Sequence, residues 1–485
     1  MLSNCARSST DRASDFGSEG WGFESLRARA NSRWYSQSMF SAKKLLIVSG
    51  TLYLLINVFF IGHSGGVPFI AADGVNYQQS LVSLNKDGLF SKYPGLFFQP
   101  AGYPLLIWSF TFFGLLPLAP TLISVQAGMH VISTLRLRQA ILNSKWSLLA
   151  NLVYLLVLLN PVLIMSTLNL GYESIAASLF ALLLSECIKM EKRAENSIFL
   201  IRISLIVGIL TFLNVRFVLL FLIVFIFRKK RWARKSKSRD ARILVFAVSI
   251  TFLPIALLSL RNTIAVGVHG PSTNLGVTLN WGAGIGATGA HNIRGTFGIP
   301  CPKLTGNQNA VGENEIRAIF FNVTEGNPPS RISRSDAYLR DCVLRWYVDN
   351  PKEMIRLLSA KALFYFSPYT GPLSHGTMTI NNPLSRELDR KMEGISSPSI
   401  DVGVRLLYSM WSIALLLLTL FGLYKIYLRQ SDVGLALFFV VFLQAAISII
   451  TIGDNRFRIP TTSLIIFISV IAIANLTSLY SSRKA

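Results

Sequence analysis

Five charged residues stand at the edges of long apolar runs in this sequence, where charge is least expected: Asp73, Glu173, Arg216, Arg456 and Arg458. A carboxylate at such an edge can serve as a general base or hold an acceptor group in place. A guanidinium there is suited to bidentate binding of a phosphate. Plainer roles fit the same positions: an Asp-Gly pair is common in turns, an acid favours a helix N-terminus, and arginine reaches lipid headgroups. The elements that carry these residues decide between the two kinds of role.

Other catalytic patterns are missing from the sequence. The five histidines show no ligand spacing, which argues against a zinc hydrolase. There is no P-loop, no G-x-S-x-G motif and no D-x-D motif, so nothing indicates a cytoplasmic nucleotide-dependent enzyme. The glycine-rich stretch Gly282–Gly289 has no basic residue directly after it and no strand is predicted before it, so it is weak as a phosphate-binding loop. No cofactor is predicted with certainty, and the sequence leaves open whether a divalent metal assists.

The composition indicates a membrane protein. Of the 485 residues, 51% are hydrophobic and 15% are charged, whereas a soluble domain carries about 25% charged residues. The net charge of +23 would suit a nucleic-acid partner. The basic residues, however, stand in short clusters between apolar runs of roughly 16–22 residues, a length typical of membrane-spanning helices. We therefore expect a polytopic all-α membrane protein that binds no nucleic acid.

About ten spanning helices are predicted. The predicted spans are Lys44–Gly62, Pro120–Leu137, Trp146–Met165, Tyr172–Lys189, Ile198–Asn214, Arg216–Phe227, Ile243–Leu260, Val404–Tyr424, Gly434–Ile452 and Thr461–Leu479. Another apolar stretch, Tyr103–Leu116, is too short and too closely bounded by prolines to span. We expect it to form a helix that lies at the membrane interface.

Positive charge sets the orientation, since Lys and Arg in short loops concentrate on the cytoplasmic side. With Tyr103–Leu116 at the interface, the basic clusters all fall on one side of the membrane: Lys43/Lys44, Arg136/Arg138/Lys145, Lys189–Arg193, Arg228–Arg242, Lys425/Arg429 and Arg483/Lys484. A crossing by Tyr103–Leu116 would put the Arg136 cluster on the opposite side. The pattern predicts a multi-pass protein of the inner or plasma membrane with both termini in the cytoplasm. The run Arg228–Arg242 then faces the anionic leaflet.

Four regions follow from this topology. Residues 1–38 are either a disordered cytoplasmic tail or a misassigned segment upstream of a start at Met39, because part of the segment resembles a translated bacterial tRNA gene. A transmembrane region, 39–260, contains the first extracytoplasmic loop (64–117). A large extracytoplasmic loop covers 261–403, within which Cys301 and Cys342 could pair, and C-terminal transmembrane helices cover 404–485. The candidate residues all fall on the extracytoplasmic side, where nucleotide-sugars are absent. Any group transfer there needs a donor delivered through the membrane, such as a lipid-linked one.

The order of these features resembles one family, the membrane glycosyltransferases of the GT-C fold that use lipid carriers, such as lipid A aminoarabinose transferases and protein O-mannosyltransferases. The resemblance runs over most of Leu45–Leu479. It rests on Asp73-Gly-Val-Asn-Tyr77, Gln99-Pro-Ala-Gly-Tyr103-Pro, the Arg136/Arg138 helix end, Glu173, Arg216, Arg261-Asn262, Ser272-Thr-Asn274-Leu-Gly276, Asn280-Trp-Gly282, the amphipathic stretch Ala337–Lys361 and Gly453-Asp-Asn-Arg-Phe-Arg-Ile-Pro460. Two departures are visible: Gly74 replaces the acid that often follows the family's first Asp, and Pro100-Ala101 replaces a Pro-Pro pair.

The resemblance implies transfer of a sugar from a polyprenyl-phosphate donor to a lipid, glycan or protein acceptor. Asp73 would deprotonate or orient the acceptor, and Glu173 would support it or hold an arginine. The implied substrate-binding residues are Tyr77, Gln99, Tyr103, Arg216, Asn262, Asn274, Arg456 and Arg458. Two alternatives remain open: a flippase or transporter of lipid-linked glycans, and a polysaccharide polymerase or ligase of the O-antigen type. The absence of an internal repeat and of charge in most span centres argues against the first.

Overall fold

A computed structural model describes residues 43–59, 61–62, 72–192, 197–232, 237–283, 329–366, 398–429, 431–451, 453 and 455–482. Every regular element among them is a helix, which confirms the prediction of an all-α chain for this part of the protein. The chain forms two compact units, residues 1–56 and 57–485. In the first unit, residues 43–56 are helical and expose large apolar side chains, including Ile47, Val48 and Leu54.

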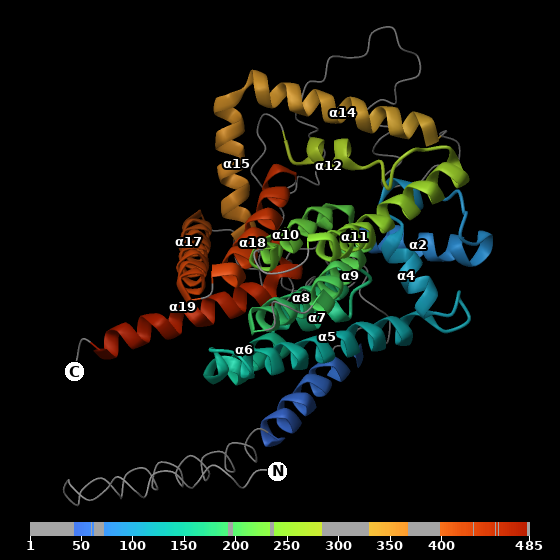
Figure 1. Cartoon of the computed structure of the whole chain (residues 1–485). Coiled ribbons are helices and arrows are strands. Elements are labelled where there is room, and N and C mark those ends of the chain that lie inside the picture. The colour runs from blue at the N-terminus through green and yellow to red at the C-terminus, as the bar shows by residue number, and fades with distance from the viewer. Residues whose placement is uncertain are drawn as a thin grey trace, which may run out of the picture. The chain divides into compact units, whose positions relative to one another are not determined.

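The second unit contains the helices labelled in Figure 1, together with α3 and three short 3-10 helices. In chain order these are α2 (Ala72–Asp87), α3 (Gly95–Phe98), α4 (Gly102–Phe110), α5 (Leu118–Leu142), η1 (Ser147–Leu149), α6 (Ala150–Leu158), α7 (Pro161–Thr167), α8 (Glu173–Lys192), α9 (Ser197–Leu213), η2 (Val215–Phe221), α10 (Leu222–Trp232), α11 (Lys237–Val266), α12 (Leu275–Trp281), α14 (Pro329–Asp349), α15 (Pro351–Phe366), α17 (Pro398–Arg429), α18 (Ser431–Ile450), η3 (Asn455–Thr461) and α19 (Thr462–Ser482).

Four of these helical stretches are long and apolar enough to cross a membrane: Leu118–Leu142, Ala241–Val266, Asp432–Ile450 and Arg456–Thr477. A fifth is added if Ser147–Leu158 and Pro161–Thr167, which meet at 51°, form one broken span. Three shorter apolar helices cover Ile198–Leu213, Val215–Phe227 and Ile413–Leu428. The helices therefore support a membrane protein, and the expectation of ten spans stays a prediction.

The bend between α6 and α7 has a local cause. Asn160 stands just before α7, and its side-chain oxygen accepts hydrogen bonds from the amides of Val162 and Leu163, each at 3.1 Å. Pro161 occupies the first helical position, where a missing amide hydrogen costs nothing. Together Asn160 and Pro161 start a new helix immediately after the old one ends, so the axis changes direction there.

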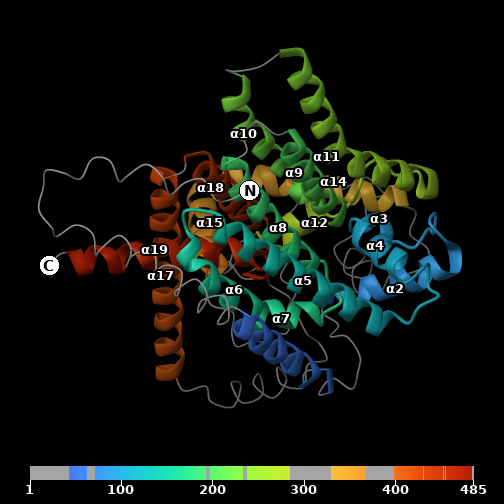
Figure 2. The same ribbon diagram turned by 60° about the horizontal axis from the view of Figure 1, so that its bottom comes forward.

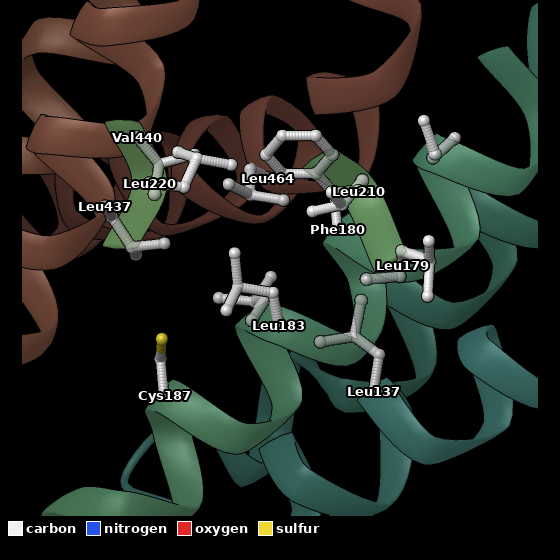
Figure 3. Packing of buried hydrophobic residues seen from close by; sticks show 14 of the residues in the cluster. Leu137, Leu179, Phe180, Leu183, Cys187, Leu210, Leu220, Leu437, Val440 and Leu464 are labelled. Carbon is white, nitrogen blue, oxygen red and sulfur yellow. The ribbon is translucent and has the colours of Figure 1, made fainter. Parts of the chain in front are cut away.

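The main core joins helices from both halves of the second unit. Figure 3 shows leucines and Phe180 from α5, α8, α9 and η2 meeting side chains of α18 and α19. The labelled residues are Leu137, Leu179, Phe180, Leu183, Cys187, Leu210, Leu220, Leu437, Val440 and Leu464. Because this core packs α8 against the C-terminal helices, the N-terminal end of α8 and the segment between α18 and α19 are also held close together.

The predicted first loop contains three helices, and α2 packs against both α3 and α4 (Figure 2). The nine residues of α4 span only about 14 Å at 1.5 Å per residue. That length is far below the roughly 30 Å of a hydrocarbon core, so α4 does not cross a bilayer alone. The predicted interfacial position of Tyr103–Leu116 is compatible with this length.

Arg261, near the end of α11, holds the first loop. Its guanidinium donates to the backbone oxygen of Leu89 at 3.1 Å and to that of Leu96 at 3.2 Å, and also to that of Ser91. Thr273, a few residues further on, donates its amide to the oxygen of Phe98 at 3.1 Å. The start of the large loop therefore fixes the shape of the first loop.

The described part of the large loop contains α12, α14 and α15. Two helices, α14 and α15, meet at Asn350-Pro351, within the stretch expected to form amphipathic helices. Figure 1 shows α12 running alongside α14. Oδ1 of Asp336 accepts a hydrogen bond from the amide of Val277 at 3.0 Å, which satisfies one of the open amides at the start of α12. Cys342 in α14 is disulfide-bonded; Cys301, its predicted partner, lies outside the described residues.

The first prediction concerns the contact of α4 with α9. A Cβ atom at Gly102 would stand 1.6 Å from the backbone oxygen of Phe212, so Gly102→Ala must push the two helices apart. Overpacking of this kind costs roughly 1–3 kcal/mol, and we expect a lower thermal midpoint in detergent. Gly128→Ala in α5 is the matched control, because a Cβ there meets nothing within 4 Å. The control should be neutral or stabilising by up to about 1 kcal/mol; equal midpoints for the two variants would contradict the packing described.

Candidate functional site

An ion pair joins the first residue of α8 to the turn before α19. Nε of Arg456 lies 3.4 Å from Oε1 of Glu173, and the two side chains are 12% and 5% exposed. Breaking a pair that is so little exposed leaves one uncompensated charge, at a cost of about 3–5 kcal/mol. Glu173 is therefore both the start of a core helix and the anchor of a distant arginine.

Arg216 approaches the same place from η2. Its Cζ atom lies 4.4 Å from the ring centroid of Phe457, 4.8 Å from that of Phe217 and 5.4 Å from that of Tyr172. The Cζ atom of Arg456 lies 5.4 Å from the centroid of Phe457. Two guanidinium groups thus share one aromatic ring, an arrangement that favours the cations by about 0.5–2 kcal/mol per contact. We call Tyr172, Glu173, Arg216, Arg456 and Phe457 the arginine cluster.

Two hydrogen-bond donors of the Arg216 guanidinium have no acceptor among the described residues. Its Nε and Nη2 atoms are buried, and neither has a hydrogen-bond partner within the part of the chain that the structure describes. A buried donor without a partner costs about 1–3 kcal/mol, and more when the group is charged. Together with Arg456, which Glu173 neutralises, this leaves one positive charge in the cluster without a paired carboxylate among the described residues. The cluster is suited to an anion.

Local sequence explains how the two arginines are presented. Asn214 directly follows α9 and caps η2. Its side-chain oxygen accepts a hydrogen bond from the backbone amide of Arg216 at 3.2 Å, and a 3-10 helix begins there in place of a continued α-helix. Gly453 has a positive φ of 82°, a conformation that glycine adopts without strain. Its amide bonds the oxygen of Ser448 at 2.7 Å, and the chain then turns from α18 into η3. We call Gly453 with η3 the arginine turn.

The turn that precedes Glu173 is fixed from α5. The side-chain Nε2 of Gln126 donates to the backbone oxygens of Thr167 and Asn169 at 3.0 and 2.9 Å. A Cβ atom at Gly171 would stand 2.5 Å from Oε2 of Glu173, so the glycine leaves room for the carboxylate. Gln126 was not among the predicted site residues, because nothing in a lone glutamine inside an apolar helix distinguishes it from other buried amides.

Two predicted tyrosines meet at the first loop. The rings of Tyr77 and Tyr103 are edge to face with centroids 4.9 Å apart, and both residues are buried. Burial raises the pKa of the Tyr103 hydroxyl, and the negative charge of Glu173 raises it further. The hydroxyl therefore stays protonated and remains a donor facing the Glu173 region. Gln99 is buried between α3 and α4.

Three other predicted residues make backbone contacts. Nη1 of Arg458 donates to the oxygen of Tyr365 at 2.7 Å. Nδ2 of Asn262 donates to the oxygen of Gly270 at 2.8 Å, and its Oδ1 accepts from Arg261 at 2.9 Å. Asn274 precedes α12, and its backbone oxygen accepts from the amide of Thr278 at 3.0 Å. These contacts hold Arg458 and Asn262 in the fold, and the predicted substrate-binding role of each stays a prediction.

Asp73 is the second residue of α2, and so lies within a helix, although an Asp-Gly turn was one interpretation of its sequence. Its side chain is outside the described part of the structure. Among the described residues, no three His, Cys, Asp or Glu side chains gather as a metal site would require.

Sequence reasoning missed one buried cation, Lys361 of α15. The residue is fully buried, and its Nζ donates to the backbone oxygen of Thr451 and lies 3.5 Å from the Tyr347 hydroxyl. Burial lowers the pKa of Lys361 to about 7. A signal was present, because Leu357, Lys361 and Tyr365 follow one another at intervals of four and so share one helix face.

No protein-family model matches the chain, and no curated protein matches it. The geometry of the arginine cluster and its surroundings is therefore the ground for a functional proposal.

The buried amine predicts how stability depends on pH. The pKa of Lys361 is about 7 in the folded protein, against 10.5 ordinarily. Between these values the unfolded chain binds more protons than the folded chain, so the free energy of unfolding rises with pH. Below pH 7 the amine is charged in both states and its burial cost is fully present. We expect the thermal midpoint of the wild type, relative to Lys361→Met, to rise between about pH 7 and about pH 10.5.

The control for this measurement is Lys352→Met, which removes an exposed lysine from the same helix. That variant should follow the wild type at every pH. A difference between wild type and Lys361→Met that stays constant across the pH range would show that the amine does not titrate in the folded state.

Proposed function

We propose that the protein transfers a sugar from a polyprenyl-phosphate carrier to an acceptor at the extracytoplasmic face of the membrane. The observation that supports this most is the Arg216 guanidinium, which has two buried donors without hydrogen-bond partners in the described residues and stands beside Arg456 and three aromatic rings. A phosphate would satisfy these donors, and the aromatic rings would pack against apolar carrier or sugar atoms.

The proposed reaction is a displacement at the anomeric carbon. An acceptor hydroxyl oxygen attacks that carbon, a new glycosidic bond forms, and the bond from the carbon to the phosphate oxygen breaks. The leaving phosphate takes the electron pair, and the acceptor proton passes to a carboxylate. Negative charge therefore grows on the phosphate as the bond breaks, which is where preorganised guanidinium donors accelerate a reaction.

Each residue then has a distinct part. Asp73 would accept the proton or orient the acceptor. Arg216 would bind the leaving phosphate, with Arg456 beside it. Glu173 would hold Arg456 in place, and Arg458 would fasten the arginine turn to α15. Tyr77 and Tyr103 would form one wall, with the Tyr103 hydroxyl as a donor.

Arg216→Lys tests the phosphate role. Lysine keeps the positive charge but lacks the planar group whose Nε and Nη2 are available. We expect transfer of radiolabel from polyprenyl-phosphate-linked sugars, measured in membranes, to fall about a hundredfold. Arg345→Lys is the matched control, because Arg345 lies exposed on α14 and should tolerate the exchange. Equal loss in both variants, or no loss in either, would count against a phosphate contact at Arg216.

Asp73→Asn tests the general base. The change keeps the size of the side chain and removes the proton acceptor, so transfer should fall by about 10²–10⁴. Asp87→Asn at the other end of α2 is the control and should retain activity. Full activity of Asp73→Asn would remove Asp73 from the mechanism. Failure of folded wild-type protein to transfer label from any donor would instead favour a flippase or a polysaccharide polymerase.

A further inference from the structure

Two buried cations fasten α15 to the arginine turn and its approach. Arg458 of η3 donates to the backbone oxygen of Tyr365, in the last turn of α15, at 2.7 Å. Lys361 of α15 donates to the backbone oxygen of Thr451, directly after the last residue of α18. Carbonyl groups at a helix C-terminus lack partners within the helix. Arg458 therefore caps the C-terminal end of α15, and Lys361 of α15 caps the C-terminal end of α18.

The two caps differ in charge. The C-terminal end of a helix carries partial negative charge, which the Arg458 guanidinium favours. Lys361 donates its hydrogen bond whether or not the amine carries the extra proton. Lys361 is fully buried and Arg458 nearly so. The caps also satisfy carbonyl groups that would otherwise be buried without a donor.

The two caps lie on either side of Arg456 and Phe457 in the sequence. Thr451 lies just before Gly453, where the backbone reverses, and Arg458 lies two residues after Arg456. The segment that carries Arg456 and Phe457 is thus held to α15 at both of its ends. Helix α15 also packs on α17, α18 and η3. Its residues Tyr365 and Phe366 belong to the same apolar cluster as Phe457.

We propose that α15 sets the position of the arginine turn, and that Lys361 is a positioning residue that acts through Thr451 on Arg456 and Phe457. The consequence for anion binding rests on the proposed function, whereas the positioning itself does not. The helix α15 belongs to the large loop, so that loop would control the geometry of the arginine cluster without contributing a side chain to it.

The test compares Lys361→Met with the wild type by hydrogen–deuterium exchange in detergent. Methionine has a similar length but no donor, so the end of α18 loses its cap. We expect the amides of Asn455–Thr461 to exchange on the order of tenfold faster, while those of α5 stay unchanged. Binding of polyprenyl phosphate, the probe without a sugar, should weaken about tenfold. Lys352→Met, on the exposed face of α15, should behave as the wild type in both assays.

Two further variants keep the test decisive. Lys361→Arg retains a cationic donor and should restore part of the protection of η3, and Arg458→Lys should loosen η3 from its other end even if Lys361→Met fails to fold. Exchange in η3 that is as slow in Lys361→Met as in the wild type would overturn the proposal. Faster exchange in η3 with no polyprenyl phosphate bound even by the wild type would uphold positioning and reject the proposed function.

Discussion

The arginine cluster depends on the ion pair between Glu173 and Arg456. The pair connects the head of α8, which is packed in the main core, to a turn that follows much later in the chain. It leaves both charges mostly shielded from solvent, so neither can be removed alone without exposing the other to a strong desolvation cost. With Arg456 neutralised in this way, the charge of Arg216 is the one that an anion would meet. The ion pair thus decides which of the neighbouring arginines is available.

Sequence alone predicts the all-helical class, because long apolar runs are interrupted by short charged clusters, and the same interruptions mark the candidate charges. It could not separate Arg456 from Arg458, which were given the same phosphate-binding role. In the structure both lie in a 3-10 helix, where each residue turns by about 120°. Side chains two positions apart therefore point in different directions. Arg456 reaches Glu173 of α8, whereas Arg458 reaches Tyr365 of α15.

Other differences arise from backbone partners, which no residue pattern reveals. Asn262 is predicted to bind substrate, on its resemblance to the start of the family's large loop. In the structure Asn262 and its neighbour Arg261 donate to carbonyl groups of Leu89, Leu96 and Gly270. Every residue carries a carbonyl group, so sequence cannot show which one a buried arginine will choose. The same holds for Lys361, whose place on the apolar face of α15 was readable but whose partner at Thr451 was not.

Five basic side chains that lie wholly or partly buried in the described part of the chain follow one pattern, with Arg216 as the exception. Arg261, Arg458 and Lys361 each donate to backbone oxygens at the end of an element or in a loop, and Arg456 pairs with Glu173. Each of these four has a partner that also holds the fold together. Arg216 differs, since its Nε and Nη2 find no such partner within the described residues and its near neighbours are aromatic rings. The rings stabilise the cation but accept no conventional hydrogen bond from these two buried nitrogens. An anion would satisfy both, which is why Arg216, more than the better-satisfied arginines around it, is the residue where a phosphate would bind.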